Sequence, residues 1–219
     1  MLFLAVFCGF LAENQREHLI EHNRAKQFAL SLLSDLRSDT AALNTAIKLG
    51  ATRMEGIDTL IAQIEQPKEK WNDILVYKHT GTAGRHRPFK NNSGTYEQMK
   101  ASGSLRYFKQ DLANLLNKYA VQAEKTKVRE EILLNYASNL VNPFVMQIID
   151  IRSVIQLQDG SVPTHPLIFR KTDKETIATW INYAAVVQST QQRTIVEYDA
   201  MLTQADKIIT ELKKQYHLK

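Results

Sequence analysis

Long stretches of this sequence contain neither glycine nor proline, and residues 13–49 and residues 104–142 are two of them. The whole chain of 219 residues has only eight glycines and five prolines. Tight turns depend on these residue types, because glycine reaches positive φ and proline fixes φ near the value that a turn requires. A sandwich or barrel with a turn about every ten residues is therefore excluded. The sequence predicts an all-α protein built from a few long helices.

Apolar residues recur at helical spacing along three parts of the chain. One stripe begins in residues 13–49 and continues to Pro67, a second runs through residues 104–142, and a third follows Thr172. In the third stripe apolar residues occupy positions a, d and e of successive heptads, which is the width that a bundle helix buries. Its members include Ile177, Trp180, Ile181, Ala184, Val187, Tyr198, Met201, Ala205, Ile208 and Leu212.

The three stripes predict an elongated antiparallel bundle of three long helices, folded as a single domain over residues 13–219. Four of the eight glycines lie between Gly81 and Gly103. Glycine clusters of this kind mark loops. We therefore expect a loop-rich insertion at residues 71–104 that holds one short helical hairpin.

Local signals predict where some helices begin and end. Thr95 with Gln98, and Thr172 with Glu175, have the spacing of a capping box, which satisfies free N–H groups at a helix start. Pro143 is expected to kink or break the second long helix, because proline lacks the N–H that a helix interior uses.

Residues 1–12 form an apolar run without charge, and the run includes the only cysteine of the sequence, Cys8. A membrane-spanning helix needs about 20 residues, so the run matches only part of a span. The basic start of a signal peptide is missing, and bulky Phe7 precedes Cys8 where a lipoprotein would carry a small residue. We expect residues 1–12 to be part of a transmembrane anchor whose first half lies upstream. The alternative is a buried amphipathic N-terminal helix.

Two segments of the chain resemble a known family. The first is FLAENQREHLIEHNRAKQFALSLLSDLRSDTAAL at residues 10–43, and the second is RPFKNNSGTYEQMKASGSLRYF at residues 87–108. Together they are similar to an uncharacterised bacterial family of small proteins, a domain of unknown function. Its members have one N-terminal transmembrane helix followed by a helical bundle, and they carry further apolar and basic residues before the equivalent of Met1. The resemblance implies an anchor and a bundle but no activity.

The strongest candidate for a binding site is the basic segment at residues 78–109. No acidic residue occurs between Asp73 and Glu97, whereas lysine, arginine and histidine are frequent there. Backbone N–H groups at the start of the expected helix at Thr95, with arginines nearby, are suited to an anion such as a phosphate, a lipid head group or an acidic partner surface. The alternative is that the segment only makes a turn and caps the helix. The candidate residues are Arg85, Arg87, Lys90, Asn91, Asn92, Thr95 and Arg106.

Signatures of catalysis are absent from the sequence, which has no GxGxxG, P-loop, HExxH or GxSxG motif. His18 and His22 share a helix face next to Glu21, but no third metal ligand is evident. We expect these histidines to be solvated. The sequence therefore predicts no enzymatic activity, no catalytic residue, no metal and no cofactor.

The formal net charge of +5 permits an anionic partner without requiring one. Nucleic acid is not expected, because only one segment is basic and the long helices are balanced in charge. The sequence predicts a membrane-anchored structural or interaction protein, such as an accessory or scaffold subunit of a membrane complex, with a protein partner or a second copy of itself. The alternative is an extracytoplasmic sensor or anion-binding module that uses the basic loop at residues 78–109. The expected location is the bacterial inner membrane, crossed once, with the bundle on the periplasmic side.

Overall fold

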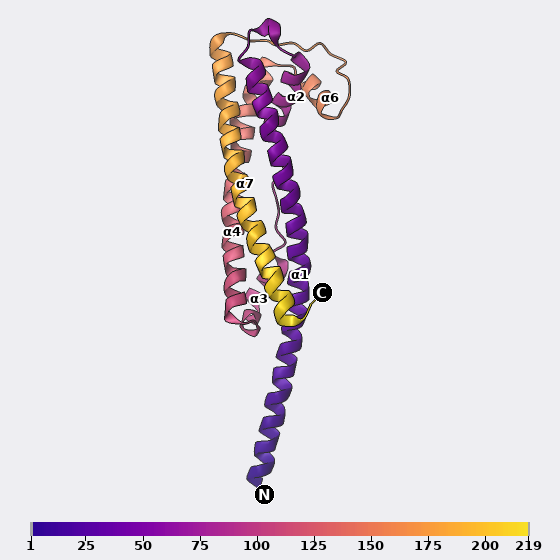
Figure 1. The fold of residues 1–219 in the computed structure, drawn as a ribbon, viewed down its shortest axis with the longest axis vertical. Coiled ribbons are helices and arrows are strands. Elements are labelled where there is room, and N and C mark those ends of the chain that lie inside the picture. Colours follow the sequence, from indigo (N-terminus) through magenta and orange to yellow (C-terminus); the bar gives the residue numbers. More distant parts are fainter. Residues whose placement is uncertain (1, 219) are drawn as a thin grey trace. The chain divides into compact units, whose positions relative to one another are not determined.

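The computed structural model describes residues 2–218, and for residues 2–5 it describes the backbone alone. Within residues 2–218 all regular secondary structure is helical, apart from an isolated bridge between Ile149 and Phe169. The prediction of an all-α protein is confirmed. The long helices are α1 (Leu2–Ile64), α4 (Gln110–Tyr136) and α7 (Lys174–Tyr216), as Figure 1 shows. The short α-helices are α2 (Asp73–Ala83), α3 (Gly94–Ala101), α5 (Asn142–Ile148) and α6 (Ile151–Gln158).

The chain divides into two compact units, and each of the three long helices contributes residues to both. Unit 1 comprises residues 1–42, 90–123 and 201–219. Unit 2 comprises residues 43–89 and 124–200. Helix α3 therefore belongs to unit 1, whereas α2, α5 and α6 belong to unit 2.

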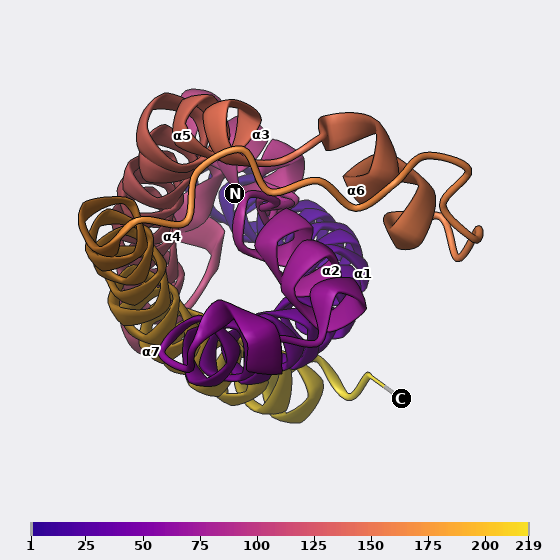
Figure 2. The same ribbon diagram turned by 90° about the horizontal axis from the view of Figure 1, so that it is seen from above.

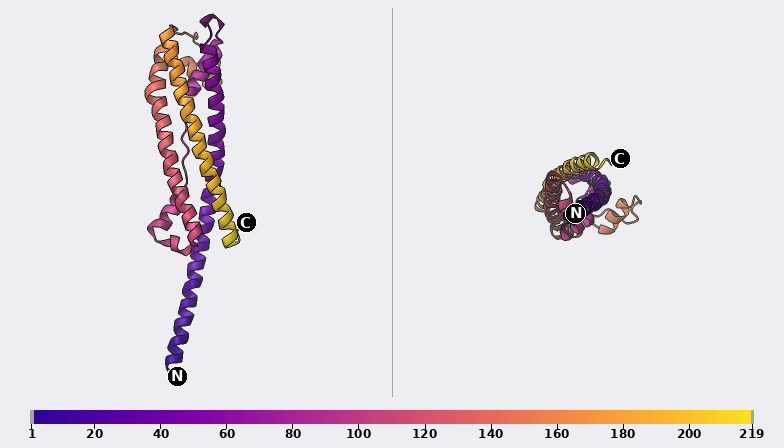
Figure 3. Two further views of the ribbon diagram at one scale, coloured as in Figure 1. Left: turned by 60° about the vertical axis from the view of Figure 1, so that its left-hand side comes forward. Right: turned by 90° about the horizontal axis from the view of Figure 1, so that it is seen from below.

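Unit 1 is a small bundle whose core comes from the predicted apolar stripes. Its buried side chains lie on α1, α4 and α7 at helical spacing, so one face of each helix is removed from water. The beginning of α1 continues past the ends of α4 and α7 within this unit (Figures 1 and 3). The fully or almost fully buried residues include Ala29, Leu32, Leu36, Leu112, Leu116, Ala205, Ile208 and Leu212.

Unit 2 has a core that is rich in aromatic residues. Trp180 of α7 and Tyr77 of α2 are both buried, and Phe169 lies edge-on against Tyr77 with ring centroids 5.1 Å apart. Helix α6 lies beside α2 (Figure 2). A Cβ atom at Gly81 of α2 would lie only 2.0 Å from Nε2 of Gln158 on α6. Glycine at this position therefore allows the two helices to approach closely.

Two helix starts differ from the predicted capping boxes. Ser93 is the N-cap residue of α3, and the hydroxyl of Thr95 donates to Oδ2 of Asp35 on α1 at 2.5 Å. At the start of α7, Asp173 accepts from the backbone N–H of Thr176 at 3.0 Å, so Asp173 takes the role expected of Thr172. At α7 the carboxylate of Asp173 is a stronger acceptor than the hydroxyl of Thr172 that the pattern indicates. At α3 the hydroxyl of Thr95 binds Asp35, and the side chain of Ser93 makes no capping bond.

Pro143 does not end the second long helix. A π-helical turn at Ala137–Val141 follows α4, and Pro143 is the second residue of α5, where a helix needs no N–H from it. The helical conformation ends only at Ile149, which is extended. The expected insertion at residues 71–104 holds two short helices, α2 and α3, although the sequence located only the start near Thr95. The side chain of Asn72 caps the start of α2 by accepting from the N–H of Leu75.

No helix among residues 2–218 has a segment that is both long enough and apolar enough to cross a bilayer. The structure therefore does not support the predicted transmembrane anchor at residues 1–12. The apolar residues belong to α1, which continues directly into a charged stretch containing Glu13, Arg16 and Glu17.

Candidate functional site

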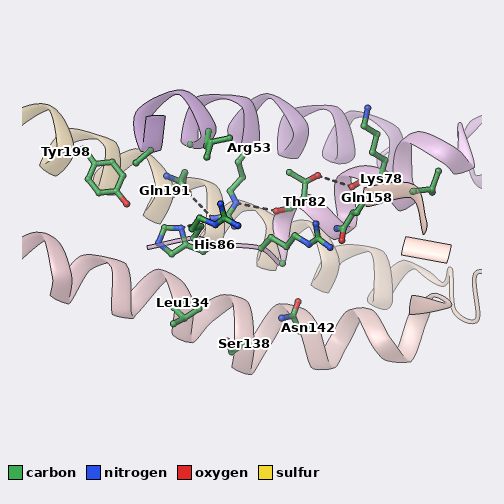
Figure 4. A pocket seen from close by; sticks show the side chains of 17 residues that line it. Arg53, Lys78, Thr82, His86, Leu134, Ser138, Asn142, Gln158, Gln191 and Tyr198 are labelled. Atoms are coloured by element: carbon green, nitrogen blue, oxygen red, sulfur yellow. Dashed lines mark hydrogen bonds between the residues drawn. The ribbon is translucent and has the colours of Figure 1, made fainter. Parts of the chain in front are cut away.

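A cavity of about 760 Å³ lies within unit 2, between α1, α2, α6, α7 and the chain around the π-helical turn (Figure 4). The extended segment after α2 forms one wall. Among the described residues that line it, four are cationic and none is acidic. Most of the others are neutral and polar or small, whereas Leu49, Leu134 and Leu157 are apolar. The cationic members are Arg53, Lys78, Arg85 and Arg87.

Arg53 of α1 is the most buried of these four cations, with 6% of its surface exposed. Its Nε donates to the backbone carbonyl of Thr82 at 3.3 Å, and its Nη1 donates to Oε1 of Gln191 on α7 at 3.0 Å. Nη1 also lies 3.4 Å from Nδ1 of His86. The guanidinium is thus held in place by Nε and Nη1, and Nη2 makes no hydrogen bond to a described residue.

All three acceptors of Arg53 are neutral. A buried charge normally has an oppositely charged partner, because removal from water is costly. Burial lowers the pKa of Arg53 to about 10, so the guanidinium remains charged at neutral pH. Within the described residues, the cavity therefore contains a buried positive charge without a carboxylate beside it.

His86 contacts Arg53 on the extended segment. Because a guanidinium can only donate, Nδ1 of His86 is the acceptor and the neutral ring carries its proton on Nε2. Nε2 is buried and has no hydrogen-bond partner among the described residues. Burial and the charge of Arg53 lower the pKa of His86 to about 4. The imidazole is therefore neutral at physiological pH and adds no charge to the cavity.

A buried glutamate on α4 holds the extended segment in place. Oε1 of Glu130 accepts the backbone N–H of Phe89 at 2.5 Å and also accepts from the hydroxyl of Tyr198 on α7. The ring of Phe89 lies edge-on to that of Tyr198, with centroids 6.1 Å apart. Burial raises the pKa of Glu130 above its usual range. These contacts fix the end of the segment that carries Arg85 and Arg87.

The other three cations are exposed and line the same cavity. Lys78 belongs to α2, and Arg85 and Arg87 to the segment that follows it. None of the three side chains forms an ion pair or hydrogen bond with a residue that the structure describes. The cavity consequently has one buried cation and three cations at its rim.

The predicted site residues are divided between the two units. Arg85 and Arg87 line the cavity of unit 2. Lys90, Asn91, Asn92, Thr95 and Arg106 belong to unit 1.

Carboxylates of α1 already bind part of the second group. Oδ1 of Asp39 accepts the backbone N–H of Asn92 at 2.8 Å and its side-chain amide at 2.9 Å. Asp35 accepts from Thr95, as described above. These N–H and O–H groups at the start of α3 therefore point to acidic side chains of the protein itself.

Arg106 lies elsewhere in unit 1, next to a second, more open hollow of about 530 Å³. Its guanidinium carbon is 5.1 Å from the ring centroid of Tyr107. The other lining residues of this hollow are His18, Glu21 and His22. Among its described lining residues Arg106 is the one arginine or lysine, and Glu21 is acidic.

Sequence reasoning missed the buried members of the cavity, Arg53 and Gln191. Both have a signal in the sequence, because each is a polar residue at a position where helical spacing predicts burial. Gln191 stands in the heptad series of α7 between Ala184 and Tyr198. A polar residue that interrupts an apolar stripe indicates either a buried hydrogen bond or a site.

Comparison with known proteins gives no match to any protein-family model, curated protein or solved structure. The resemblance to a bacterial family of unknown function therefore remains a prediction.

Proposed function

We propose that this protein is a binding module for a small anionic molecule, which it holds in the cavity of unit 2. The observation that carries the proposal is the guanidinium of Arg53, which is buried in the cavity wall and bonded only to neutral acceptors. This proposal corresponds to the anion-binding module that the sequence analysis gives as the alternative function. It keeps Arg85 and Arg87 from the predicted site and adds Arg53 and Lys78. It assigns no chemical step to the cavity.

The physical argument rests on charge compensation. Transfer of an unpaired ion out of water is unfavourable, whereas a charge that meets an opposite charge in the same low-dielectric space is stabilised. An anion in the cavity would accept from the unused Nη2 of Arg53 and would neutralise the cations at the rim. Hydrogen bonds between arginine and an anionic oxygen are among the strongest in proteins.

Thermal unfolding in the presence of defined anions tests the proposal. Inorganic phosphate, sulfate and citrate are compared with chloride at equal ionic strength, and the fluorescence of buried Trp180 reports unfolding. We expect at least one of the three anions to raise Tm in a saturable way, because a ligand that binds only the folded state stabilises it by mass action. The proposal is overturned if none of the three raises Tm above the chloride value.

Two sets of variants separate a site from general charge screening. Arg85→Ala with Arg87→Ala removes two exposed cations from the rim, and we expect the dissociation constant to rise by about tenfold or more. Lys127→Ala with Lys174→Ala removes two exposed cations from unit 2 outside the cavity, and we expect no change. Equal losses in both double variants would contradict the proposal. Arg53→Lys keeps the charge but loses the planar fork, so it should also weaken binding.

A second candidate function concerns the first turns of α1. Val6, Phe7, Phe10 and Leu11 are between 47% and 67% exposed, so four large apolar side chains face solvent within six residues. Exposed apolar patches of this kind mark interaction sites. We propose that this segment engages a lipid surface, in keeping with the predicted anchored structural or interaction protein with an elongated bundle at the bacterial inner membrane.

The single cysteine provides a direct test of the lipid contact. Cys8 is exposed between Phe7 and Phe10, so a polarity-sensitive dye on its thiol should shift to the blue when vesicles of zwitterionic and anionic phospholipid are added. Phe10→Glu with Leu11→Glu should abolish the shift. Leu30→Glu, at another exposed apolar position of α1, should leave it unchanged. An unshifted dye in the unmodified sequence would exclude this second candidate.

A further inference from the structure

We infer that the ligand of the unit 2 cavity is a small polyanion, a molecule with at least two anionic groups. This inference rests on the proposed anion binding and adds the charge and class of the ligand.

The first support is the number of unpaired cations. Arg53, Lys78, Arg85 and Arg87 line one cavity, and no aspartate or glutamate is among its described lining residues. None of the four forms an ion pair with a described residue. Cavities lined by one sign of charge concentrate the field of that sign. A ligand with a single charge would leave most of that field uncompensated.

The second support is the difference in depth between these cations. Arg53 is 6% exposed, whereas Lys78, Arg85 and Arg87 are exposed. One anionic group of the ligand would therefore meet Arg53 inside the cavity, and another would meet the cations at the rim. Two anionic groups would compensate the cations at both depths better than a single compact anion would.

The third support is the wall between these two positions. Ser138 and Asn142 lie on the side of the cavity opposite Arg53 and Thr82, and Gln158 lies toward the Lys78 side (Figure 4). These hydroxyl and amide groups can donate to oxygen atoms of a ligand. A polar wall of this kind suits a hydrophilic molecule.

The size of the cavity indicates the class of molecule. A volume of about 760 Å³ lies within the range typical of sites for small organic ligands. It is much larger than a single inorganic anion requires. The chemistry shared by the candidates is a set of anionic oxygens on a small body, which a polycarboxylate or a phosphorylated small molecule would provide.

Calorimetric titration with two charge ladders tests the inference. One ladder is acetate, succinate and citrate, and the other is inorganic phosphate, pyrophosphate and tripolyphosphate, all at one ionic strength and neutral pH. We expect the affinity to rise by about tenfold for each added anionic group on at least one ladder. A steeper carboxylate ladder would identify a polycarboxylate as the source of the charge, and a steeper phosphate ladder would identify a phosphorylated molecule.

The double variant Arg85→Ala with Arg87→Ala provides the matched measurement. This variant should lose most of the increase in affinity from the shortest to the longest member of the ladder, because the second anionic group of the ligand loses its cationic partners. The variant Lys127→Ala with Lys174→Ala should keep the gain. If acetate or phosphate binds as tightly as the longer members, the inference is wrong while the proposed function stands. If no member of either ladder binds, the proposed function fails as well.

Discussion

The hydroxyl of Tyr119 on α4 donates to Oδ2 of Asp39 on α1 at 2.8 Å, and both side chains are buried in unit 1. The other oxygen of Asp39 accepts two N–H groups of Asn92. One carboxylate therefore joins two long helices and the segment that precedes α3. Burial and the neighbouring charge of Asp39 raise the pKa of Tyr119 above its usual range, so the phenol stays protonated and remains a donor.

Tyr119→Phe should lower the free energy of unfolding by about 1.5–3 kcal/mol, the range for a hydrogen bond to a charged group. The substitution removes only the donor, and it leaves the buried carboxylate one partner short. Urea denaturation followed by circular dichroism measures the change. Tyr96→Phe is the control, because the Tyr96 hydroxyl makes an exposed bond to Asn117 at 2.7 Å. Losses of equal size in the two variants would contradict the assigned role of Asp39.

The neutral His86 predicts a dependence of stability on pH. Its pKa is about 4 in the folded protein and about 6.5 in the unfolded chain, so between these values only the unfolded chain gains the proton. Stability should therefore fall as the pH falls from about 6.5 to about 4, with a slope of up to about 1.4 kcal/mol per pH unit from this group.

His86→Asn isolates that contribution, because asparagine keeps an acceptor for Arg53 but does not titrate. Urea denaturation at several pH values measures both proteins. We expect the curve of the variant to be flatter than that of the unmodified sequence over this window. Parallel curves would show that His86 is not held in its neutral form by the fold.

The close approach of α6 to α2 predicts the effect of a single methyl group. In Gly81→Ala the new Cβ would lie 2.5 Å from Cγ1 of Val154 and still nearer to Nε2 of Gln158, so these side chains of α6 must shift. We expect a loss of about 1–3 kcal/mol, as for other overpacked sites. Gly94→Ala is the control, since a Cβ at Gly94 would point into open space, and it should be neutral. Thermal unfolding gives the Tm of each variant. Equal Tm values for Gly81→Ala and Gly94→Ala would contradict the prediction.

Glu130 should control the order of the segment that carries the rim arginines. In Glu130→Leu the backbone N–H of Phe89 loses its acceptor, so its hydrogen exchange should become faster and anion affinity should fall. Glu130→Gln retains a carbonyl oxygen as acceptor, and its effect should be smaller. Glu131→Leu, at the adjacent exposed position, is the control. Exchange at Phe89 that is equally slow in Glu130→Leu would contradict the role of this contact.

The fold class could be predicted from the sequence because a helix shows itself in the spacing of apolar residues within one segment. The a and d positions that predicted burial on α7 are buried from Ala184 to Leu212, as the spacing indicates. The starts of α3 and α7 were located to within about two residues. The predicted bond of Thr95 was wrong, because its hydroxyl donates to Asp35 of α1, which is distant in sequence and lies outside any local pattern.

The candidate site followed from the sequence only in part. Arg85 and Arg87 were found because a run of cations without acidic residues is visible in one segment. Three further residues, Arg53, Gln191 and Glu130, come from three different helices. Only the fold brings Arg53 and Gln191 into one cavity, and only the fold places Glu130 against the segment that carries Arg85 and Arg87.

The sequence by itself determined the helical class, the three long helices and their buried faces, because each depends on spacing within one segment. The tertiary structure decided which polar residues of those faces meet, and so which charges remain without a partner. Arg53 shows the difference. Its place on the inner face of α1 is a local property, but its lack of a carboxylate depends on what α2, α7 and the segment at His86 place around it. Hydrogen bonds and ion pairs act over a few ångströms in space, whatever the separation along the chain.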